Sequence, residues 1–408
     1  MQTNSDTAAW LRLQLTPGVG AVASRRLLAA FSLPQNIFQQ SASALREVVS
    51  EKQTQALLQE PANFSAALHC LDLWLEQSGQ GLITLGDANY PKSLLLSPDP
   101  PLCFYVQCAD WAWWQTWAKQ EQAPLLGMVG SRKPSPQGLK IAQTWAQEIA
   151  QSGFSVVSGL ALGIDAAAHQ GALQAPKWGL GRSIAVVGTG LDQVYPKQHA
   201  ALAQGVLDAG GAIISEYPLG TPAIAANFPK RNRIIAGLSL GVLVVEAALQ
   251  SGSLITARLA MEANREVFAV PGSIYALQSQ GCHALIKQGA QLVESAQELI
   301  QAFPGSAIDK IAAQAAFSLE NANKHLENQK QKSVTAKPES HKHNIATQKD
   351  GEEAPSLLLD ALGFSPMALD ALLLQLPYSA AQLQMDLLQL ELAGKVARLP
   401  GGLYQRIV

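Results

Sequence analysis

Residues 156–169 read Val156-Val-Ser-Gly-Leu-Ala-Leu-Gly-Ile-Asp-Ala-Ala-Ala-His169. A short β-branched run ends in Ser-Gly, a glycine-spaced loop follows, and an alanine-rich segment begins a helix. Glycines let the backbone turn sharply and approach a ligand closely, and a helix N-terminus directs free N–H groups at an anion. The stretch therefore predicts a strand, a phosphate-binding loop and a helix of a parallel-sheet protein.

The same strand-then-loop pattern recurs on both sides of this stretch. Short, almost wholly apolar runs alternate with spacers of helical length, which is typical of parallel strands covered by helices on both faces. We predict strands at residues 125–129, 155–157, 184–187, 212–215, 242–245, 267–270 and 291–293. A doubly wound sheet binds ligands beyond the carboxyl ends of its strands, so function is expected in the loops that follow them.

Composition divides the 408 residues into four parts. Residues 1–80 are expected to form a small helical domain, 81–304 the sheet domain, 305–354 a flexible linker and 355–408 a small terminal domain. The linker is rich in Lys, Asn, Gln, Glu, Ser and His, and it has too few large apolar residues to bury a core. The predicted fold class is α/β, with an extended Rossmann-like domain between two small flanking domains.

The N-terminal domain contains Thr16-Pro-Gly-Val-Gly20 between two predicted short helices, with Arg25 and Arg26 on the second. This pattern resembles a helix-hairpin-helix, in which a Gly-x-Gly turn holds a DNA phosphate at a helix N-terminus. The alternative is a glycine turn that only joins two packed helices, because the motif is short and has no second copy. Further elements are expected as helices at 42–58 and 64–78 and as a strand at 81–86.

The C-terminal domain is expected to hold three helices and a hairpin, the pattern of a winged helix. The helices are predicted at 356–362, 367–375 and 380–392, and the hairpin strands at 395–399 and 403–407. The third helix lacks Lys and Arg, whereas a groove-reading helix usually contacts phosphates and base edges. We therefore favour a protein-contact or structural role for this domain, with duplex reading as the alternative.

Whole-chain composition excludes several classes of protein. The formal net charge is −2, so any polyanion site must come from locally concentrated cations. The four cysteines are scattered without CxxC or zinc spacing, and no run of about 18 apolar residues predicts a membrane span. No basic and apolar leader begins the chain. We expect a cytoplasmic protein without a metal or cofactor.

The first two loops supply candidate phosphate contacts. After the strand at 125–129, Gly130 permits the turn, Ser131 offers a hydroxyl and Arg132 a planar fork suited to phosphate; a simple helix start is the alternative. In the opening stretch the candidates are the Ser158 hydroxyl and the backbone of Gly159, Leu160 and Gly163. We interpret Asp165 as orienting that loop. His169 is either a base or, as we favour, a buried hydrogen-bonded side chain.

The remaining loops complete the candidate site. Gly188 and Gly190 allow close backbone approach. For Tyr195 the alternatives are stacking on a base and local packing. For Lys197 a phosphate contact and no such contact are equally open. The strongest local charge is the run Asn227, Phe228, Pro229, Lys230, Arg231, Asn232 and Arg233. Its cations are expected to neutralise phosphates and Phe228 to stack on a base, although at least one arginine should pair with Glu216 or Glu246. Ser251, Gly252, Ser253 and Thr256 add donors near a helix start.

Common catalytic signatures are missing. The chain has no Walker A sequence, no His-Glu-x-x-His, no Gly-x-Ser-x-Gly and no paired carboxylates in a recognisable pattern. Several phosphate-friendly loops without a nucleophile, metal site or obvious base favour binding over turnover, and we predict that the protein is not an enzyme.

Taken together, the loop motifs resemble those of the DNA-processing protein A family (DprA, also called Smf). The resemblance covers about residues 80–300 and is specific as an ordered set, although each motif alone is weak. The segments that carry it are Val129-Gly-Ser-Arg132, Ser158-Gly-Leu-Ala-Leu-Gly-Ile-Asp165 with His169, Gly188-Thr-Gly-Leu-Asp192 with Tyr195-Pro196, Ser215-Glu-Tyr-Pro218, Asn227-Phe-Pro-Lys-Arg-Asn-Arg-Ile-Ile235, Val244-Val-Glu-Ala247, Ser251-Gly-Ser-Leu-Ile-Thr-Ala257 and Val270-Pro-Gly272.

The resemblance implies a Rossmann-like domain that binds single-stranded DNA, and a homodimer that loads the RecA recombinase onto incoming DNA in natural transformation. An N-terminal helical domain and a C-terminal winged-helix-like domain commonly flank it in that family. One departure is Leu162, where many members carry Arg. Its absence puts more weight on Arg132 and on the cations of 230–233.

A different class of function stays open as the alternative. Rossmann-like phosphoribohydrolases act on nucleoside monophosphates, and here Glu246 or Asp165 would be the acid or base. The Pro-Gly-Gly-x-Gly-Thr signature of that group is absent from this sequence.

Overall fold

The computed structural model describes residues 5–120, 124–175 and 181–303, together with scattered residues between 358 and 406. The chain forms two compact units, residues 1–327 and 328–408. The predicted linker at 305–354 lies outside the described residues.

The first unit begins with a helical domain built around a small apolar core. The two helices predicted around the Gly18 turn are present, whereas the single helix expected at 42–58 is two helices. The first of these ends with Glu47 as its C-cap, and Ser50 begins the second by forming a capping box with Gln53. The helices are α1 (Ser5–Leu15), α2 (Ala21–Phe31), α3 (Pro34–Phe38), α4 (Ala42–Arg46), α5 (Glu51–Leu58) and α6 (Phe64–Leu75).

The centre of the unit is a nine-stranded sheet in the order β1-β2-β6-β5-β4-β3-β7-β8-β9. All seven predicted parallel strands are present to within one residue at either end, and β1 and β2 add an antiparallel edge. The strands are β1 (Gln80–Thr84), β2 (Cys103–Cys108), β3 (Leu125–Val129), β4 (Ser155–Ser158), β5 (Ser183–Val187), β6 (Ala212–Ser215), β7 (Gly241–Val244), β8 (Glu266–Ala269) and β9 (Gln291–Leu292).

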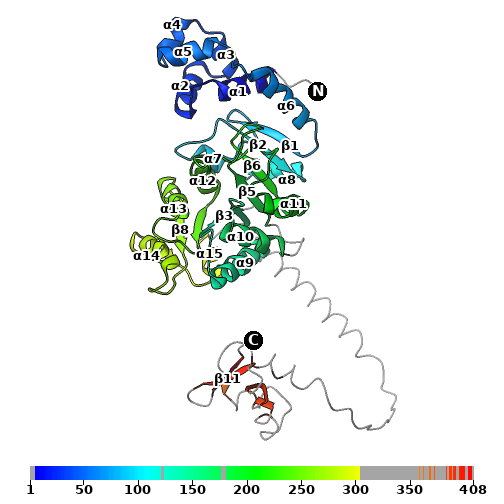
Figure 1. Ribbon diagram of the computed structural model, residues 1–408, viewed down its shortest axis with the longest axis vertical. Helices are drawn as coiled ribbons and strands as arrows, with labels where there is room; N and C mark the ends of the chain where they lie inside the picture. Colours follow the sequence, from blue (N-terminus) through cyan, green and yellow to red (C-terminus); the bar gives the residue numbers. More distant parts are fainter. Residues whose placement is uncertain are drawn as a thin grey trace, which may run out of the picture. The chain divides into compact units, whose positions relative to one another are not determined.

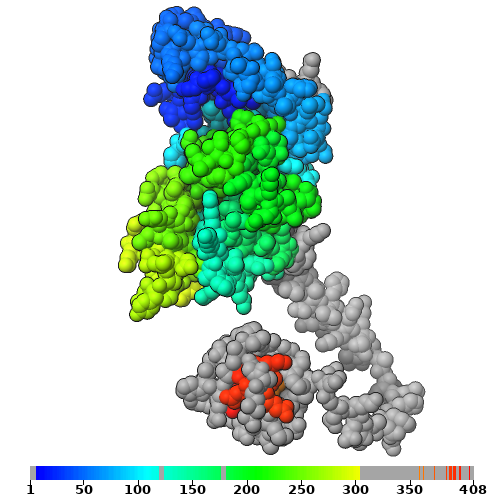
Figure 2. All heavy atoms as spheres, in the orientation of Figure 1, coloured from blue at the N-terminus to red at the C-terminus, as the bar shows by residue number. Residues whose placement is uncertain are grey.

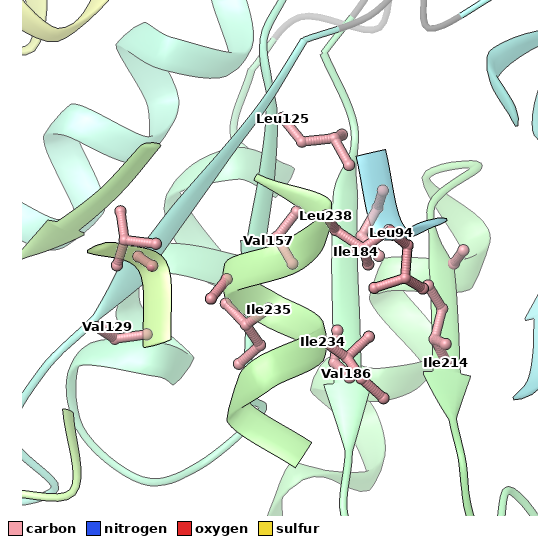
Figure 3. Packing of buried hydrophobic residues seen from close by; sticks show 14 of the residues in the cluster. Leu94, Leu125, Val129, Val157, Ile184, Val186, Ile214, Ile234, Ile235 and Leu238 are labelled. Atoms are coloured by element: carbon pink, nitrogen blue, oxygen red, sulfur yellow. The ribbon is translucent and has the colours of Figure 1, made fainter. Parts of the chain in front are cut away.

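Helices cover both faces of this sheet (Figure 1). One face carries α8 (Trp111–Gln120), α12 (Asn227–Leu238), α13 (Ser253–Glu262) and α14 (Gln280–Lys287). The other face carries α9 (Pro136–Gln151), α10 (Ile164–Leu173) and α15 (Ala296–Gln301). Helix α11 (Ala200–Asp208) packs beside β5 and β6. Alternate strand residues point to opposite faces. In Figure 3, Ile234 and Ile235 of α12 pack against Val157 and Val186 of the strands.

The strand order reverses beside β3. The chain passes from β3 to β4 on one side and returns from β6 to β7 on the other. Helices α9, α10 and α13 follow parallel strands and α12 follows β6, so all four begin at the carboxyl edge of the sheet. This edge, where a doubly wound sheet usually binds ligands, is therefore surrounded by helix N-termini.

The helical domain (blue) lies directly against the sheet domain (Figure 2), on the side of the antiparallel strands β1 and β2 (Figure 1). Gln14 of α1 donates a hydrogen bond to the Glu216 carbonyl (2.8 Å) and accepts one from the Tyr105 hydroxyl (3.1 Å). Arg25 of α2 pairs with Asp99, in the segment before β2, at 2.6 Å. These contacts fix the helical domain close to the end of β6.

The second unit contains a three-stranded sheet in the order β10-β12-β11. Strands β11 (Val396–Leu399) and β12 (Leu403–Arg406) form the predicted hairpin. The helix predicted from residue 367 is wrong at its start, because the backbone of β10 (Met367–Ala368) pairs with the free edge of β12. Most of the three predicted helices lies outside the described residues, but the leucines described there are buried in one core: Leu358, Leu362, Leu372, Leu383, Leu387 and Leu390.

Candidate nucleic-acid interface

Three exposed or half-exposed side chains meet at the carboxyl edge of the sheet. The guanidinium carbon of Arg132, after β3, lies 5.8 Å from the ring centroid of Phe228, in the first turn of α12. The Tyr195 ring, after β5, lies 5.4 Å from the same ring at an angle of 38°. We call Arg132, Tyr195 and Phe228 the aromatic ledge. It presents π-faces and a cation together, the combination that binds unpaired bases and phosphates.

The backbone beneath the ledge holds Phe228 in place. A Cβ at Gly188 would lie 3.1 Å from the Phe228 ring, so the ring packs directly on glycine backbone. The Asn227 amide donates to the Gly188 carbonyl (3.1 Å), and the Tyr217 hydroxyl donates to the Asn227 carbonyl (3.1 Å). Gly188 and Asn227 thus support the ledge, whereas the sequence suggested direct ligand contacts for both.

Two exposed lysines flank the ledge. Lys197 begins the short 3-10 helix that follows Tyr195, and Lys230 lies in the first turn of α12. Neither lysine has a salt bridge within 4.0 Å to a described carboxylate. Both positions remain available to an anion at the surface.

The amide groups of the opening glycine loop are satisfied from inside the protein. The Asp165 carboxylate accepts the N–H groups of Gly159 (3.2 Å) and Ala161 (3.4 Å), and His169 Nε2 accepts that of Leu160 (3.3 Å). The prediction that Gly159 and Leu160 cradle a phosphate is therefore corrected, because the loop already holds a carboxylate of its own chain. Asp165 orients the loop, as the sequence suggested.

The other polar groups of this loop are also engaged. The Ser158 hydroxyl is buried and donates to the Met128 carbonyl (2.6 Å), which corrects its predicted role as a phosphate contact. Gly163 has a φ of +80°, and a side chain there would clash with the Ser131 carbonyl, which accepts the Ile164 N–H at 3.1 Å. The loop is therefore a tight packing element between β3 and α10.

His169 is a buried structural residue. Since Nε2 accepts a hydrogen bond, the ring proton lies on Nδ1, which donates to the Ser183 hydroxyl at 2.7 Å. Burial, reinforced by the charges of Arg231 and His199, lowers the pKa of His169 to about 3. The ring is neutral at physiological pH, and the favoured reading of a buried side chain agrees with the structure.

Arg231 is also inside the protein, with only 3% of its surface exposed. Its guanidinium donates to the carbonyls of Gly159 (2.7 Å) and Val186, joining α12 to the ends of β4 and β5. Burial lowers the pKa of Arg231 to about 10 and raises the pKa of Asp165, although the two charges attract each other. The prediction that Arg231 contacts phosphate is corrected.

Arg233 points toward the helical domain. It pairs with Glu216, and its Nε lies 2.8 Å from Asp99. The expectation that at least one arginine of the cluster pairs with Glu216 or Glu246 is confirmed, and the predicted phosphate contact of Arg233 is corrected. Burial raises the pKa of Glu216 despite the nearby arginine. Asp99 thereby joins two arginines, because it also binds Arg25.

The crevice at the reversal of strand order is filled by a protein carboxylate. Glu246, after β7, accepts hydrogen bonds from the backbone N–H of Ser135 (2.9 Å) and from its hydroxyl. Ser135 in turn caps α9 by accepting the Gly138 N–H at 3.0 Å. A side chain at Gly138 would clash with Glu246. The helix N-terminus that would bind a dinucleotide phosphate is therefore occupied by Glu246.

The remaining predicted residues do not join the ledge through any contact in the described part of the chain. The Ser251 and Ser253 hydroxyls bond each other (2.6 Å), Thr256 is buried, and Gly252 is exposed at the start of α13. Gly190 donates to the Thr221 carbonyl (3.0 Å). Gly130 packs against Ile164, the Ser131 hydroxyl accepts the Lys133 N–H, and Asn232 is half-buried on α12.

Two further observations limit the chemistry of the described ranges. No three His, Cys, Asp or Glu side chains within them are grouped to hold a metal ion. The same ranges contain no helix that combines the length and apolar character needed to cross a membrane.

The fold and the site together define a Rossmann-like protein whose strand-end edge offers cations and aromatic rings in place of a nucleotide pocket. Comparison with known families identifies it further. The chain belongs to the family of DNA recombination-mediator protein A, the DprA/Smf family of DNA-processing proteins: the family model matches residues 81–304, and the model of the DprA winged helix domain matches residues 345–402.

Several relatives share most of the chain. Protein Smf of Synechocystis sp. is 35% identical over 407 residues, covering 99% of both chains. Protein Smf of Escherichia coli is 42% identical over 300 residues, covering 72% of this chain and 75% of its own. The X-ray structure of DNA processing protein A from Streptococcus pneumoniae covers 74% of this chain and 99% of its own, at 33% identity and a TM-score of 0.57. The fold is therefore shared with a solved member of the family.

Sequence reasoning missed two residues that organise the site. Asp99 lies in a proline-rich segment without periodicity, and nothing in its neighbourhood indicates that arginines 74 and 134 positions away in the chain converge on it. The capping role of Glu246 was missed as well. A polar residue directly after a strand at the reversal point was the available signal, since such residues face the carboxyl edge.

Proposed function

We propose that this protein binds single-stranded DNA along the carboxyl edge of its sheet, without reading sequence. Phe228 and Tyr195 would stack on bases, and Arg132, Lys197 and Lys230 would neutralise successive phosphates. The aromatic ledge is the observation that carries this proposal, because it combines a cation and two rings at the surface.

The division of polar groups supports a strand over a mononucleotide. The glycine loop and the N-terminus of α9, which would hold one phosphate deeply, are occupied by Asp165 and Glu246. The cations left at the surface are spread over three segments: residues 132, 197 and 230. A ligand with several phosphates can engage all three segments at once.

We further propose that the protein is not an enzyme. In the hydrolase alternative, Glu246 or Asp165 supplies the acid or base, but each carboxylate is bound to backbone N–H groups that fix a helix start or a loop. Incubation of the pure protein with nucleoside monophosphates should release no free base. Release that is abolished by Glu246→Gln would establish the hydrolase instead.

The family relationship supports a role in DNA uptake and recombination in the cytoplasm, in which the protein protects incoming DNA and loads RecA recombinase onto it. A strand-exchange assay with RecA, single-stranded DNA and a single-strand-binding protein tests this step. The protein should shorten the delay before RecA filaments form, and no effect on that delay would exclude the loading role.

We also propose a homodimer formed through apolar side chains on two adjoining loops. The Ala247 N–H donates to the Gln278 carbonyl at 2.7 Å, which holds the loops after β7 and β8 side by side. Leu249 is 59% exposed, and Ile274, Tyr275 and Leu277 are 72%, 88% and 67% exposed. Such a patch usually marks a protein contact. Leu277→Arg should convert a dimer to a monomer in sedimentation analysis, and an unchanged mass would exclude this face.

Titration of labelled single-stranded and duplex oligonucleotides at two salt concentrations tests DNA binding itself. We expect preference for the single strand and strong salt dependence. The double variant Arg132→Ala/Phe228→Ala should lose most of the affinity. Lys287→Ala is the matched control, since this exposed lysine ends α14 at the opposite edge of the sheet. Equal affinity of the double variant and the wild type would refute the site.

A further inference from the structure

The helical domain contributes a cavity of about 790 Å³ that the ledge does not use. It lies between the first turns of α2, the turn joining α4 to α5, and the segment before β2. Three arginines line it, Arg25, Arg26 and Arg46, together with the carboxylates of Asp99 and Glu47. The cavity therefore carries a cationic cluster in a chain whose net charge is −2.

The cavity wall formed by α2 is joined to α5 by a hydrogen bond and offers free donors. Gly18 has a φ of +76°, and its carbonyl accepts a hydrogen bond from Gln53 of α5 at 2.9 Å. The hydrogen bonds of α2 begin with Ser24 N–H to the Gly20 carbonyl, and no side chain caps the helix. The amide groups of residues 21–23, which line the cavity, therefore have no acceptor within the helix.

The arginines differ in how firmly they are held. Arg25 is fixed by Asp99 and by the Pro100 carbonyl. Arg46 pairs with Glu51, but both side chains are 53% exposed, so an incoming anion can displace this partner. Arg26 is exposed and has no salt bridge among the described residues. Arg26 is therefore the cation most accessible to a ligand.

One ion-pair network links the cavity to the helix that carries part of the ledge. Asp99, in the cavity wall, binds Arg25 of α2 and Arg233 of α12. Arg233 lies on the same helix, about one turn after Lys230 and about one and a half turns after Phe228. A strand that continued from the ledge along α12 would run toward Asp99 and the α2 wall. The two arginines also neutralise Asp99, which would otherwise repel a phosphate.

We propose that this cavity binds a backbone phosphate of the same DNA strand that the aromatic ledge holds, through Arg26 and the free amide groups of α2. The inference rests on the proposed function and extends its binding path into the helical domain. The phosphodiester, rather than a base, is the group recognised, because the donors are backbone amides and guanidinium groups.

Oligonucleotide length separates the two sites. An oligonucleotide of about six nucleotides fits the ledge alone, whereas one of about 30 exceeds the usual site of a single-strand-binding fold, about 4–16 nucleotides, and reaches both. With the full-length protein, Arg26→Ala should weaken binding of the long probe about fivefold and reduce its salt slope by about 0.7, while leaving the short probe unchanged. Arg132→Ala should weaken both probes.

Gly20→Asp is a second variant, which distinguishes a loss of phosphate binding from a loss of stability. Gly20 has a φ of −80°, and a Cβ there meets no atom within 4 Å, so the side chain is accommodated. Aspartate is a favourable N-cap, so the melting temperature should stay the same or rise. Its carboxylate would occupy the phosphate position, and affinity for the long probe should fall.

Lys52→Ala is the matched control, because Lys52 is an exposed cation of α5 that does not line the cavity. It should leave both probes unaffected. The inference is overturned if Arg26→Ala and Gly20→Asp bind the long probe like the wild type, if they weaken only duplex binding, or if Lys52→Ala weakens it equally. The proposed function fails separately, if Arg132→Ala affects neither probe.

Discussion

The aromatic ledge and the polar network beneath it arise from the same loops, but the first faces a ligand and the second holds the protein together. The ledge consists of Arg132, Tyr195 and Phe228 at the surface; we call Asp165, His169 and Arg231 the buried network. Arg132 contacts an aromatic ring and solvent, whereas Arg231 lies inside and binds two backbone carbonyls. Depth, rather than residue type, thus separates a ligand contact from a structural contact.

The largest expected effect comes from removing the buried cation. Arg231→Ala leaves Asp165 buried without its compensating charge and leaves two strand-end carbonyls unsatisfied. We expect a loss of about 3–5 kcal/mol in the free energy of unfolding, measured by urea denaturation. Arg132→Ala should change stability by less than about 0.5 kcal/mol. If Arg231→Ala kept full stability and lost only DNA affinity, Arg231 would belong to the ledge.

Acid should weaken the buried network through His169. Its pKa is about 3 in the folded protein and about 6.5 when unfolded, so the unfolded state binds more protons between these values. The stability that neutral His169 contributes is therefore present above about pH 6.5 and is lost as the pH falls toward 3. Between pH 7 and pH 5 the protonation of His169 on unfolding should lower the free energy of unfolding by about 2 kcal/mol.

Comparison with His169→Gln isolates that contribution. The variant should lose about 2 kcal/mol less than the wild type over the same pH interval, measured by denaturation at each pH. Asp165 acts in the opposite direction at lower pH, since burial raises its pKa and the folded state then holds its proton more tightly than the unfolded state. Identical losses in both proteins would show that His169 does not titrate on unfolding.

On the ledge, the ring should matter more than any one charge. Phe228→Ala should weaken single-strand binding by about 1–3 kcal/mol, because a base loses its stacking partner. Phe228→Tyr retains the ring and should retain most of the affinity in the same anisotropy titration. A Phe228→Ala variant with unchanged affinity would reduce the ledge to an electrostatic site.

A single ledge cation should have a smaller effect that depends on salt. Arg132→Ala should reduce the slope of log affinity against log salt by about 0.7, the value for one single-strand phosphate. Arg132→Lys retains the charge without the planar fork and should fall between the wild type and Arg132→Ala. An unchanged salt slope in Arg132→Ala would place the phosphate elsewhere.

The smallest effect is expected at Glu246. Glu246→Gln removes a carboxylate from the N-terminus of α9 but keeps an acceptor for Ser135, so stability should fall by about 0.3–1 kcal/mol. DNA affinity should not change, because the crevice is separate from the ledge. A large loss of affinity with intact stability would join the crevice to the DNA site.

The run of residues 227–233 shows where sequence reasoning was limited. The sequence predicts a loop whose cations contact phosphate, with at least one arginine paired inside the protein, but the run forms the first turns of α12. Successive residues of a helix point about 100° apart. Lys230 therefore faces solvent, Arg231 the sheet and Arg233 the helical domain, although they are almost adjacent in the chain. A charge cluster on a helix is divided among its faces, and only the packing of that helix assigns them.

The sequence by itself determined the sheet domain, its seven parallel strands and the hairpin near the C-terminus. Apolar runs bounded by glycine loops carry that information locally, since a strand buried on both faces has few alternatives. The tertiary structure alone decided that the glycine loop at residues 156–169 encloses its own carboxylate, that Glu246 closes the crevice, and that Arg132 rather than Arg231 meets solvent. Those outcomes depend on which distant backbone groups a side chain reaches after the helices pack.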